Sequence, residues 1–160
     1  MSHREKIMTL SQALDRRKDL AARGLKLVFT NGCFDLLHPG HLRYLAEARA
    51  LGDFLLVGLN SDRSISALKG PSRPVCPEAV RAEMLAGLAS VDAVVVFDQD
   101  TPLELITALA PDVLVKGGDW PAAEIVGGPL VLERGGQVRS LLLAEGFSST
   151  SLIERIRGRA

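Results

Sequence analysis

The chain has 160 residues, of which 47% are apolar, enough for the core of one domain. Nineteen Lys and Arg residues balance nineteen Asp and Glu residues, and only 4% of the residues are aromatic. This composition argues against a nucleic-acid partner, a membrane surface and a base-stacking platform. Two cysteines, no apolar run of membrane-spanning length and a polar N-terminus without a signal peptide predict a cytoplasmic protein without a disulfide framework.

Apolar runs and helical spacing alternate along the chain. A capping box at Thr9 opens the first helix, which Gly24 ends, and residues 1–24 are expected to pack as a helical segment on a domain of residues 25–160. Strands are predicted at residues 25–30, 54–59, 91–97, 112–115 and 138–143, and further helices at 42–51, 77–88, from Pro102 onward and at 148–157. The pattern of residues 121–133 predicts no defined element.

This alternation predicts an α/β fold with a parallel sheet and right-handed crossovers. Ligands of such sheets lie beyond the carboxyl ends of the strands, where the strand order reverses. Polar clusters follow the predicted strands at residues 31–41, 60–62 and 116–120, and a fourth opens the last helix at 148–151. We expect these clusters to converge on one site.

The run of residues 31–41 is the most informative of these clusters, because it joins a strand to a helix through small residues and ends in two histidines. The first amides and the dipole of a helix favour a bound phosphate. His38 and His41 are three positions apart, so both imidazoles lie on one side of the turn and can donate to phosphate oxygens. Gly40 leaves room for a ligand close to the backbone. The run therefore predicts a site for a nucleotide or another phosphate ester.

A metal site is the competing interpretation of the same run, because Cys33, Asp35, His38 and His41 are all possible ligands. Their spacing matches no common structural zinc pattern, and Cys76 has no paired cysteine nearby in the sequence. Cys33 is also a candidate nucleophile, since a helix N-terminus lowers a thiol pKa. No sequence signature of a cysteine hydrolase surrounds it, and a small buried residue is the favoured interpretation.

The other polar clusters each allow two interpretations. Lys69 and Arg73 belong to a proline-containing loop, which is either a basic lid over phosphates or two solvated charges. The segment of Lys116, Gly118 and Asp119 is either a support for a base and a ribose or a simple turn. The hydroxyl residues 148–151 either bind phosphate or cap the last helix.

The sequence His38-Pro39-Gly40-His41 matches an H-x-G-H motif, and the chain resembles the cytidylyltransferase-like nucleotidyltransferases. Within them it is most similar to the bacterial D-glycero-β-D-manno-heptose 1-phosphate adenylyltransferases, from about residue 9 to residue 156. The matching stretches are residues 29–35, 60–62, 68–70, 73–75, 97–102, 116–119 and 145–150. Glycerol-phosphate cytidylyltransferases are similar but carry an arginine where Leu143 stands here, and Ser149 stands where a threonine is usual.

The resemblance implies a Rossmann-like three-layer sandwich with a mainly parallel central sheet of about five strands. It also implies transfer of AMP from ATP to heptose 1-phosphate, which gives ADP-heptose for the lipopolysaccharide inner core and pyrophosphate. Mg²⁺ would be bridged by the ATP phosphates, with no metal ligand assigned among the residues. A homodimer is expected, and because the sequence has no kinase half, a separate heptose kinase would supply the 1-phosphate.

Carried over position by position, the resemblance assigns a role to each candidate residue. The expected catalytic residues are His38, His41, Lys69 and Arg73. The expected nucleotide-binding residues are Thr30, Asn31, Gly32, Cys33, Phe34, Gly40, Lys116, Gly118, Asp119, Ser148, Ser149 and Thr150. Asp35, Asn60 and Asp62 are expected at the substrate. The hydroxyl residues would hold the outgoing pyrophosphate, and the amides of Cys33 and Phe34 would hold phosphate oxygens.

Three alternatives remain open at this point. Another transferase of the same fold, such as a glycerol-phosphate cytidylyltransferase or a pantetheine-phosphate adenylyltransferase, would use a different nucleotide or acceptor. A non-catalytic nucleotide-binding module would bind ATP without releasing pyrophosphate. A metal-binding regulator would carry stoichiometric zinc.

Overall fold

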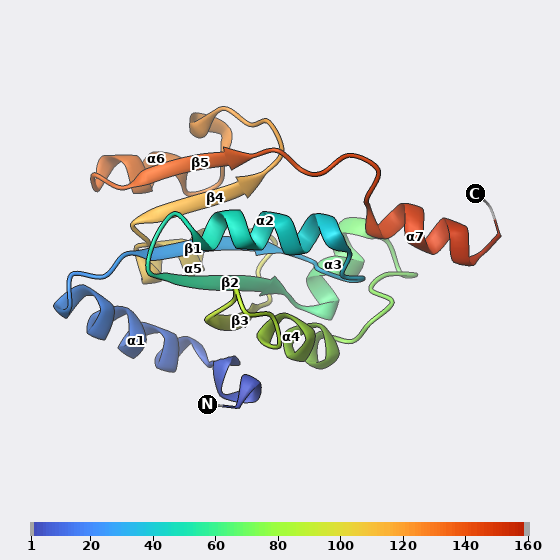
Figure 1. The fold of residues 1–160 in the computed structure, drawn as a ribbon, viewed down its shortest axis with the longest axis horizontal. Helices are drawn as coiled ribbons and strands as arrows, with labels where there is room; N and C mark the ends of the chain where they lie inside the picture. The colour runs from blue at the N-terminus through green and yellow to red at the C-terminus, as the bar shows by residue number, and fades with distance from the viewer. Residues whose placement is uncertain (1, 159–160) are drawn as a thin grey trace.

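The computed structural model describes residues 2–158, so Met1 and the last two residues of the predicted 25–160 domain lie outside the described residues. Five strands form one sheet in the order β3-β2-β1-β4-β5 (Figure 1). The strands are β1 Leu27–Gly32, β2 Phe54–Asn60, β3 Ala93–Phe97, β4 Val113–Gly117 and β5 Gln137–Leu141. All four strand pairs are parallel, which confirms the predicted α/β fold with a five-stranded sheet.

The strand order reverses at β1. This strand pairs with β2 on one side, where Leu27 lies opposite Phe54, and with β4 on the other, where Val28 lies opposite Val113. The chain thus fills one half of the sheet with β2 and β3 before it returns to the other half. The carboxyl ends of β1 and β4 consequently flank the place where sheets of this topology bind ligands.

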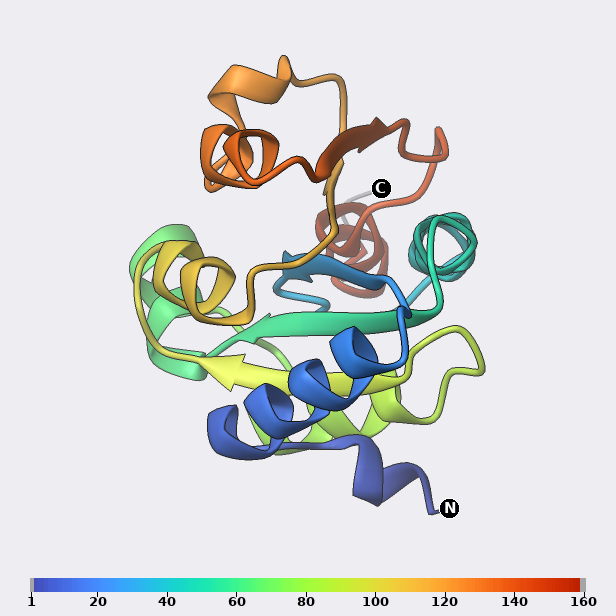
Figure 2. The same cartoon turned by 90° about the vertical axis from the view of Figure 1, so that its left-hand side faces the viewer.

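Helices cover both faces of the sheet (Figure 2). One face packs against α2 and α4, through residues such as Leu45 and Leu85, and the other packs against α1, α5 and α6, through residues such as Leu20, Ile106 and Val131. The helices are α1 Leu10–Ala22, α2 Pro39–Arg49, α3 Asp62–Lys69, α4 Glu78–Ala86, α5 Leu103–Leu109, α6 Gly128–Glu133 and α7 Ser149–Ile156, with short 3₁₀ turns at His3–Lys6 and Ala122–Glu124. The predicted three-layer sandwich is therefore present. No helix in the part of the chain that the structure describes is long and apolar enough to cross a membrane.

Two helices differ from the sequence-based expectation. The apolar spacing of residues 77–88 places Val80 and Met84 on the buried face, yet they are 47% and 56% exposed, and Arg81 is buried instead. The reason is local, because the Arg81 guanidinium meets four acceptors inside the protein. Helix α3 follows directly after β2 where only a turn was predicted, and the Ser61 hydroxyl caps it by accepting from the Ser64 amide.

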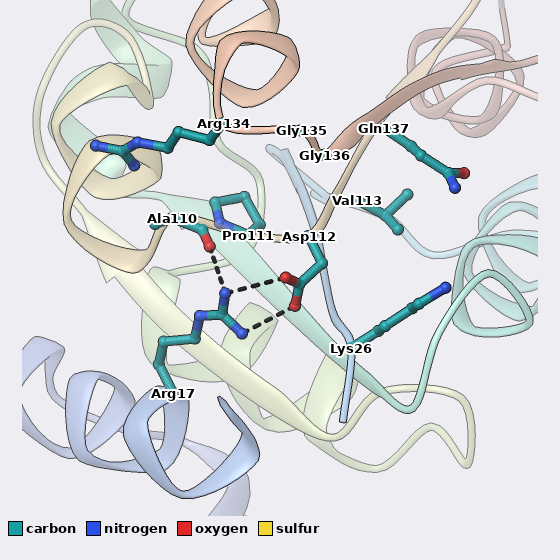
Figure 3. A pocket seen from close by; sticks show the side chains of 10 residues that line it. All are labelled: Arg17, Lys26, Ala110, Pro111, Asp112, Val113, Arg134, Gly135, Gly136 and Gln137. Carbon is teal, nitrogen blue, oxygen red and sulfur yellow. Dashed lines mark hydrogen bonds and ion pairs between the residues drawn. The ribbon is translucent and has the colours of Figure 1, made fainter. Parts of the chain in front are cut away.

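At the amino ends of the strands, hydrogen bonds from Arg17 add to the apolar packing of α1 on the sheet (Figure 3). Arg17 donates to both carboxylate oxygens of Asp112, at 2.8 and 3.1 Å, and to the carbonyl oxygens of Leu109 and Ala110. Asp112 in turn accepts from the Leu27 amide at the start of β1, at 2.8 Å. A cavity of about 290 Å³ opens beside this ion pair. The cavity lies at the end of the sheet opposite to the predicted site.

Candidate active site

The two histidines lie at the end of the turn that connects β1 to α2. His38 is the N-cap of α2 with extended backbone (φ −143°), and Pro39 takes the first helical position, where its missing N–H costs no hydrogen bond. The His41 amide donates to the His38 carbonyl oxygen at 3.0 Å, so both residues belong to the first turn. Helix α2 thereby points its free amides and positive dipole end toward the carboxyl ends of the strands.

The imidazoles of His38 and His41 stack on each other, with ring centroids 3.8 Å apart and planes inclined by 23°. The ring centroid of Phe34 lies 5.2 Å from that of His41, and the ring centroid of Phe147 lies 6.0 Å from that of His38. The Nδ1 atoms of both histidines are buried and have no hydrogen-bond partner among the described residues. Buried polar atoms normally have a partner, so this pair of orphaned nitrogens indicates a ligand that supplies one.

Burial keeps both imidazoles uncharged in the free protein. It lowers the pKa of His41 to about 4, with repulsion from the protonated form of His38 and from Lys69 adding to the effect, and it also lowers the pKa of His38. At neutral pH both rings are therefore neutral. A polyanion bound beside them would favour the charged form and raise both pKa values again.

This gives a testable proton linkage. At about pH 5.5, above the free pKa of His41, we expect ATP binding to take up protons as the bound phosphates raise that pKa. Calorimetric titrations in two buffers of different ionisation enthalpy measure the uptake, and His41→Asn isolates the share of this residue. Equal proton uptake by the wild type and the variant would show that His41 does not meet the phosphates.

A cavity of about 210 Å³ lies beyond the carboxyl ends of β1 and β4. The turn after β1, the end of β4 and the start of α7 line this cavity, and Lys69 and Lys116 bring two positive charges to it. Its lining residues are Asn31, Gly32, Cys33, Phe34, Asp35, His41, Tyr44, Lys69, Lys116, Gly117, Leu143 and Ser149. Nine of the predicted site residues thus come together in one cavity, from four separate segments of the chain.

A second cavity of about 480 Å³ adjoins the first, since Lys69 lines both. It lies between the loop after α3 and one face of α7, and it is lined by Lys69, Ser72, Arg73, Thr150, Ile153, Glu154 and Arg157. Helix α7 has no buried residue and stands beyond the strand ends (Figure 1). The adjacent hydroxyl residues Ser149 and Thr150 therefore face different cavities, while Ser148 caps the helix by accepting from the Ser151 amide at 2.9 Å.

The carboxylate of Asp35 holds the basic loop in place. It accepts from Arg73 Nε at 2.8 Å and from the amides of Val75 and Cys76 at 2.9 Å each. Burial alone would raise the pKa of Asp35, but these donors together keep that pKa below its usual value. Arg73 Nη2 remains buried without a partner among the described residues. Asp35 thus orients Arg73, and the free nitrogen of Arg73 is the group left for a ligand.

Several predicted residues lie outside both cavities with their side chains engaged inside the protein. Thr30 is fully buried and bonds the Tyr44 hydroxyl at 2.5 Å. Asn60 donates to Ser64, and Asp62 accepts from Arg81 at 2.8 Å. The structure therefore gives Thr30, Asn60 and Asp62 internal partners, although the sequence suggested the nucleotide or the substrate.

The surroundings of Gly40 and Gly118 explain why glycine stands at each position. A Cβ at Gly40 would lie 2.9 Å from the His38 ring, so the missing side chain makes room for the histidine stack. Gly118 has a φ of +106°, and its open side faces the Trp120 indole. Gly118 and its neighbour Asp119 line neither cavity.

Sequence reasoning gave no role to three residues around the site, Tyr44, Arg81 and Leu143, while Gly117 lies within the predicted segment 116–119. Tyr44 follows His41 by three positions, so it lies on the same side of α2, and this spacing was a usable signal. Arg81 occupies a buried position of α4 between apolar residues. Arginine is rarely buried unless it has partners inside the protein, so this position was a weak signal of internal hydrogen bonds. Leu143 was noted only as the position where glycerol-phosphate cytidylyltransferases carry an arginine, because an exposed leucine after an edge strand has no distinctive pattern of its own.

Comparison with known proteins places this geometry in a family. A family model described as cytidylyltransferase-like matches residues 29–155. The chain is 59% identical over 137 residues to the bifunctional protein HldE of Syntrophotalea carbinolica and 52% identical over 157 residues to that of Nitrobacter hamburgensis. These matches cover 86% and 98% of this chain but only 28% and 32% of the relatives, so the chain spans about a third of their length.

A solved structure agrees with the family model. The crystal structure of the lipopolysaccharide core biosynthesis protein from Thermoplasma volcanium GSS1 is 26% identical to the chain, with a TM-score of 0.61, and covers 76% of this chain and 98% of its own. The family model begins within β1 and ends within α7, so it includes the histidine turn, the whole first cavity and all of the second cavity's lining except Arg157. The chain belongs to the cytidylyltransferase-like family.

Proposed function

We propose that the protein transfers AMP from ATP to D-glycero-β-D-manno-heptose 1-phosphate, giving ADP-heptose and pyrophosphate. The observation that carries the proposal is the stacked pair His38 and His41, whose orphaned Nδ1 atoms lie at a helix N-terminus. Lys69 and Lys116 line the same cavity as His41 and supply the charge that a triphosphate needs. The site is thus suited to a phosphoryl group that gains negative charge during a reaction.

The choice of acceptor is supported by similarity. The HldE proteins share more than half of their aligned residues with this chain, and the related solved structure is named for lipopolysaccharide core biosynthesis. The motifs at Lys69 and at residues 116–119 resemble those of heptose 1-phosphate adenylyltransferases. The ADP-heptose formed would serve the lipopolysaccharide inner core.

The reaction needs no protein nucleophile. An oxygen of the sugar 1-phosphate attacks the α-phosphorus of ATP and forms the new P–O bond. The bond from the α-phosphorus to the oxygen that bridges it to the β-phosphorus breaks, and pyrophosphate leaves with that electron pair. Catalysis then consists of positioning the two substrates and stabilising the charge on the transferred group.

The residues of the two cavities divide this work. We assign His38, His41 and the amides of Cys33 and Phe34 to the phosphates of ATP, and Lys69 and Arg73 to phosphates at the junction of the cavities. Lys116 in the first cavity is assigned to the nucleoside together with Gly118 and Asp119, which follow it closely in the chain, with Asp119 accepting from a ribose hydroxyl. Ser149 and Thr150 are assigned to the outgoing pyrophosphate.

Mg²⁺ enters the proposal only as the ion that ATP carries. Among residues 2–158, no three His, Cys, Asp or Glu side chains come together in an arrangement that suits a metal ion. The carboxylate in the first cavity, Asp35, already accepts from Arg73 and two amides. These residues do not make a protein cage for a metal, and no step is assigned to one.

The substrate and the compartment follow from the reaction. An ATP-dependent kinase can phosphorylate the anomeric hydroxyl of a sugar, and we propose a separate heptose kinase as the source of the 1-phosphate. ATP is a cytoplasmic substrate, and the two cysteines are free thiols, as a reducing compartment allows. The homodimer that the resemblance implies stays a prediction, which light scattering during size-exclusion chromatography would test.

An acceptor panel tests the proposed function. We expect rapid pyrophosphate release with ATP and heptose 1-phosphate, and release at least about a hundredfold slower with CTP and glycerol 3-phosphate or with ATP and pantetheine phosphate. Preference for either of these other pairs would replace the proposed reaction by that of another family member. Tight ATP binding without release for any acceptor would identify a binding module.

A further inference from the structure

Arg81 is the most deeply buried charged residue near the site. Its side chain is 0% exposed, while its one carboxylate partner, Asp62, is 44% exposed. The guanidinium donates Nε to the Cys76 carbonyl at 2.9 Å and Nη1 to the carbonyls of Cys33 and Asn60 at 2.8 Å each. Nη2 donates to Asp62 at 2.8 Å. One side chain therefore joins the turn after β1, the end of β2, the start of α3 and Cys76 in the loop between α3 and α4.

The bond to the Cys33 carbonyl determines where the next amide points. In a planar trans peptide the C=O and the following N–H point in opposite directions. Because Arg81 holds the Cys33 oxygen, the Phe34 N–H faces away from Arg81. This N–H donates to no acceptor among residues 2–158, and both Cys33 and Phe34 line the first cavity.

The backbone of Phe34 needs such support. Its φ is +44°, in the left-handed region that a side chain other than glycine rarely adopts. An arginine that fixes the preceding carbonyl keeps this conformation in place. Arg81 and Asp35 also hold Cys76 from two sides, at its carbonyl and its amide, so the turn and the basic loop keep a fixed spacing.

We infer that Arg81 is a positioning residue for nucleotide binding, which aims the Phe34 amide at a phosphate and fixes the distance between the turn and the loop that carries Arg73. The expected change in kcat/KM rests on the proposed function. The expected effect on nucleotide binding does not depend on which acceptor the protein uses. Arg81 itself touches no substrate, because its side chain is 0% exposed and lines neither cavity, and the carbonyls and Asp62 use four of its five N–H groups.

A purely structural role makes a different prediction, and Arg17 is the matched control. Arg17 also donates to carbonyl oxygens and to one aspartate, with a side chain 19% exposed, but it does so at the amino ends of the strands (Figure 3). A structural role predicts that Arg81→Gln and Arg17→Gln both lower the thermal midpoint and leave the activity per folded molecule unchanged. A positioning role predicts that only the Arg81 variant changes the kinetics.

We expect Arg81→Gln to lower kcat/KM for ATP about a hundredfold and Arg81→Lys about tenfold, because a displaced amide and loop misalign the phosphates. Arg17→Gln should stay within about twofold of the wild type per folded molecule. Arg81→Lys keeps the buried charge and is the variant of choice if Arg81→Gln does not fold. Wild-type kcat/KM in folded Arg81→Lys would overturn the inference.

A binding experiment separates this inference from the proposed function. The chain has five phenylalanines, so ¹⁵N-phenylalanine labelling gives a spectrum in which the Phe34 amide is assigned with one Phe34→Leu variant. We expect ATP alone to shift the Phe34 amide strongly in the wild type and in Arg17→Gln, and weakly in Arg81→Lys. An unmoved Phe34 amide in the wild type, or an equal shift in Arg81→Lys, would overturn the inference. Loss of the shift in Arg81→Lys would support it even if no acceptor gave turnover.

Discussion

Replacing His41 by alanine is expected to lower turnover by at least about a hundredfold while the protein stays folded. The His41 ring lies in the cavity against His38, with a buried Nδ1 that has no partner among the described residues. A hydrogen bond from His41 to a ligand phosphate is strongest when negative charge builds up on that phosphate in the transition state. The loss should therefore appear mainly in kcat, with a smaller change in KM for ATP.

His3 provides the control for this experiment. It lies on the surface beside Glu83, with a distance of 3.1 Å between its Nε2 and a carboxylate oxygen, and its side chain is 47% exposed. His3→Ala should leave turnover unchanged, and circular dichroism should show that both variants fold. Near-normal turnover of folded His41→Ala would show that the role assigned to His41 is wrong.

Replacing Asp35 by asparagine is expected to cost about 3 kcal/mol of unfolding free energy, because it leaves the Arg73 charge buried without its partner. The side chains of Asp35 and Arg73 are 1% and 10% exposed. The asparagine also loses the charge that the amides of Val75 and Cys76 now stabilise. Urea unfolding measures the loss, and the freed Arg73 should raise KM for the phosphate substrates.

Asp15→Asn is the matched surface control. Asp15 pairs with Lys18 at 3.3 Å, with side chains 72% and 78% exposed, so its loss should change the stability little. The pH dependence gives a second check. Because the folded pKa of Asp35 is lowered, its stabilisation exists above the usual carboxyl range and disappears as the pH falls through that folded pKa. A stability difference from wild type that stays constant into strong acid would contradict the assignment.

The fold was largely predictable because buried strands leave an unmistakable pattern. The runs at residues 25–30, 54–59 and 91–97 are mostly apolar, and the structure buries most of each run in β1, β2 and the edge strand β3. Helices were predictable where a capping box or a proline marked their start, as at Thr9 and Pro39. Short elements without a periodic pattern, such as α3 and α6, were not, since neighbouring contacts rather than local sequence stabilise them.

The residues of the site were largely predictable from the sequence, but the hydrogen bonds and ion pairs between them were not. Sequence spacing brought His38 and His41 together, and the strand-end rule brought residues 31–35 and Lys116 to the same cavity. It could not show that the Asp35 carboxylate is occupied by Arg73, because that pair is 38 residues apart in the chain. Arg81 was hidden for the same reason, since its acceptors are carbonyl oxygens, which every residue carries.

The most direct test of the central claim follows the label of [α-³²P]ATP in the presence of heptose 1-phosphate. Transfer of AMP predicts that the α-phosphate label appears in ADP-heptose, with one pyrophosphate released for each labelled product, and that His41→Ala abolishes both signals together. A label that stays in ATP, AMP or ADP, while the sugar phosphate remains unchanged, would contradict the account.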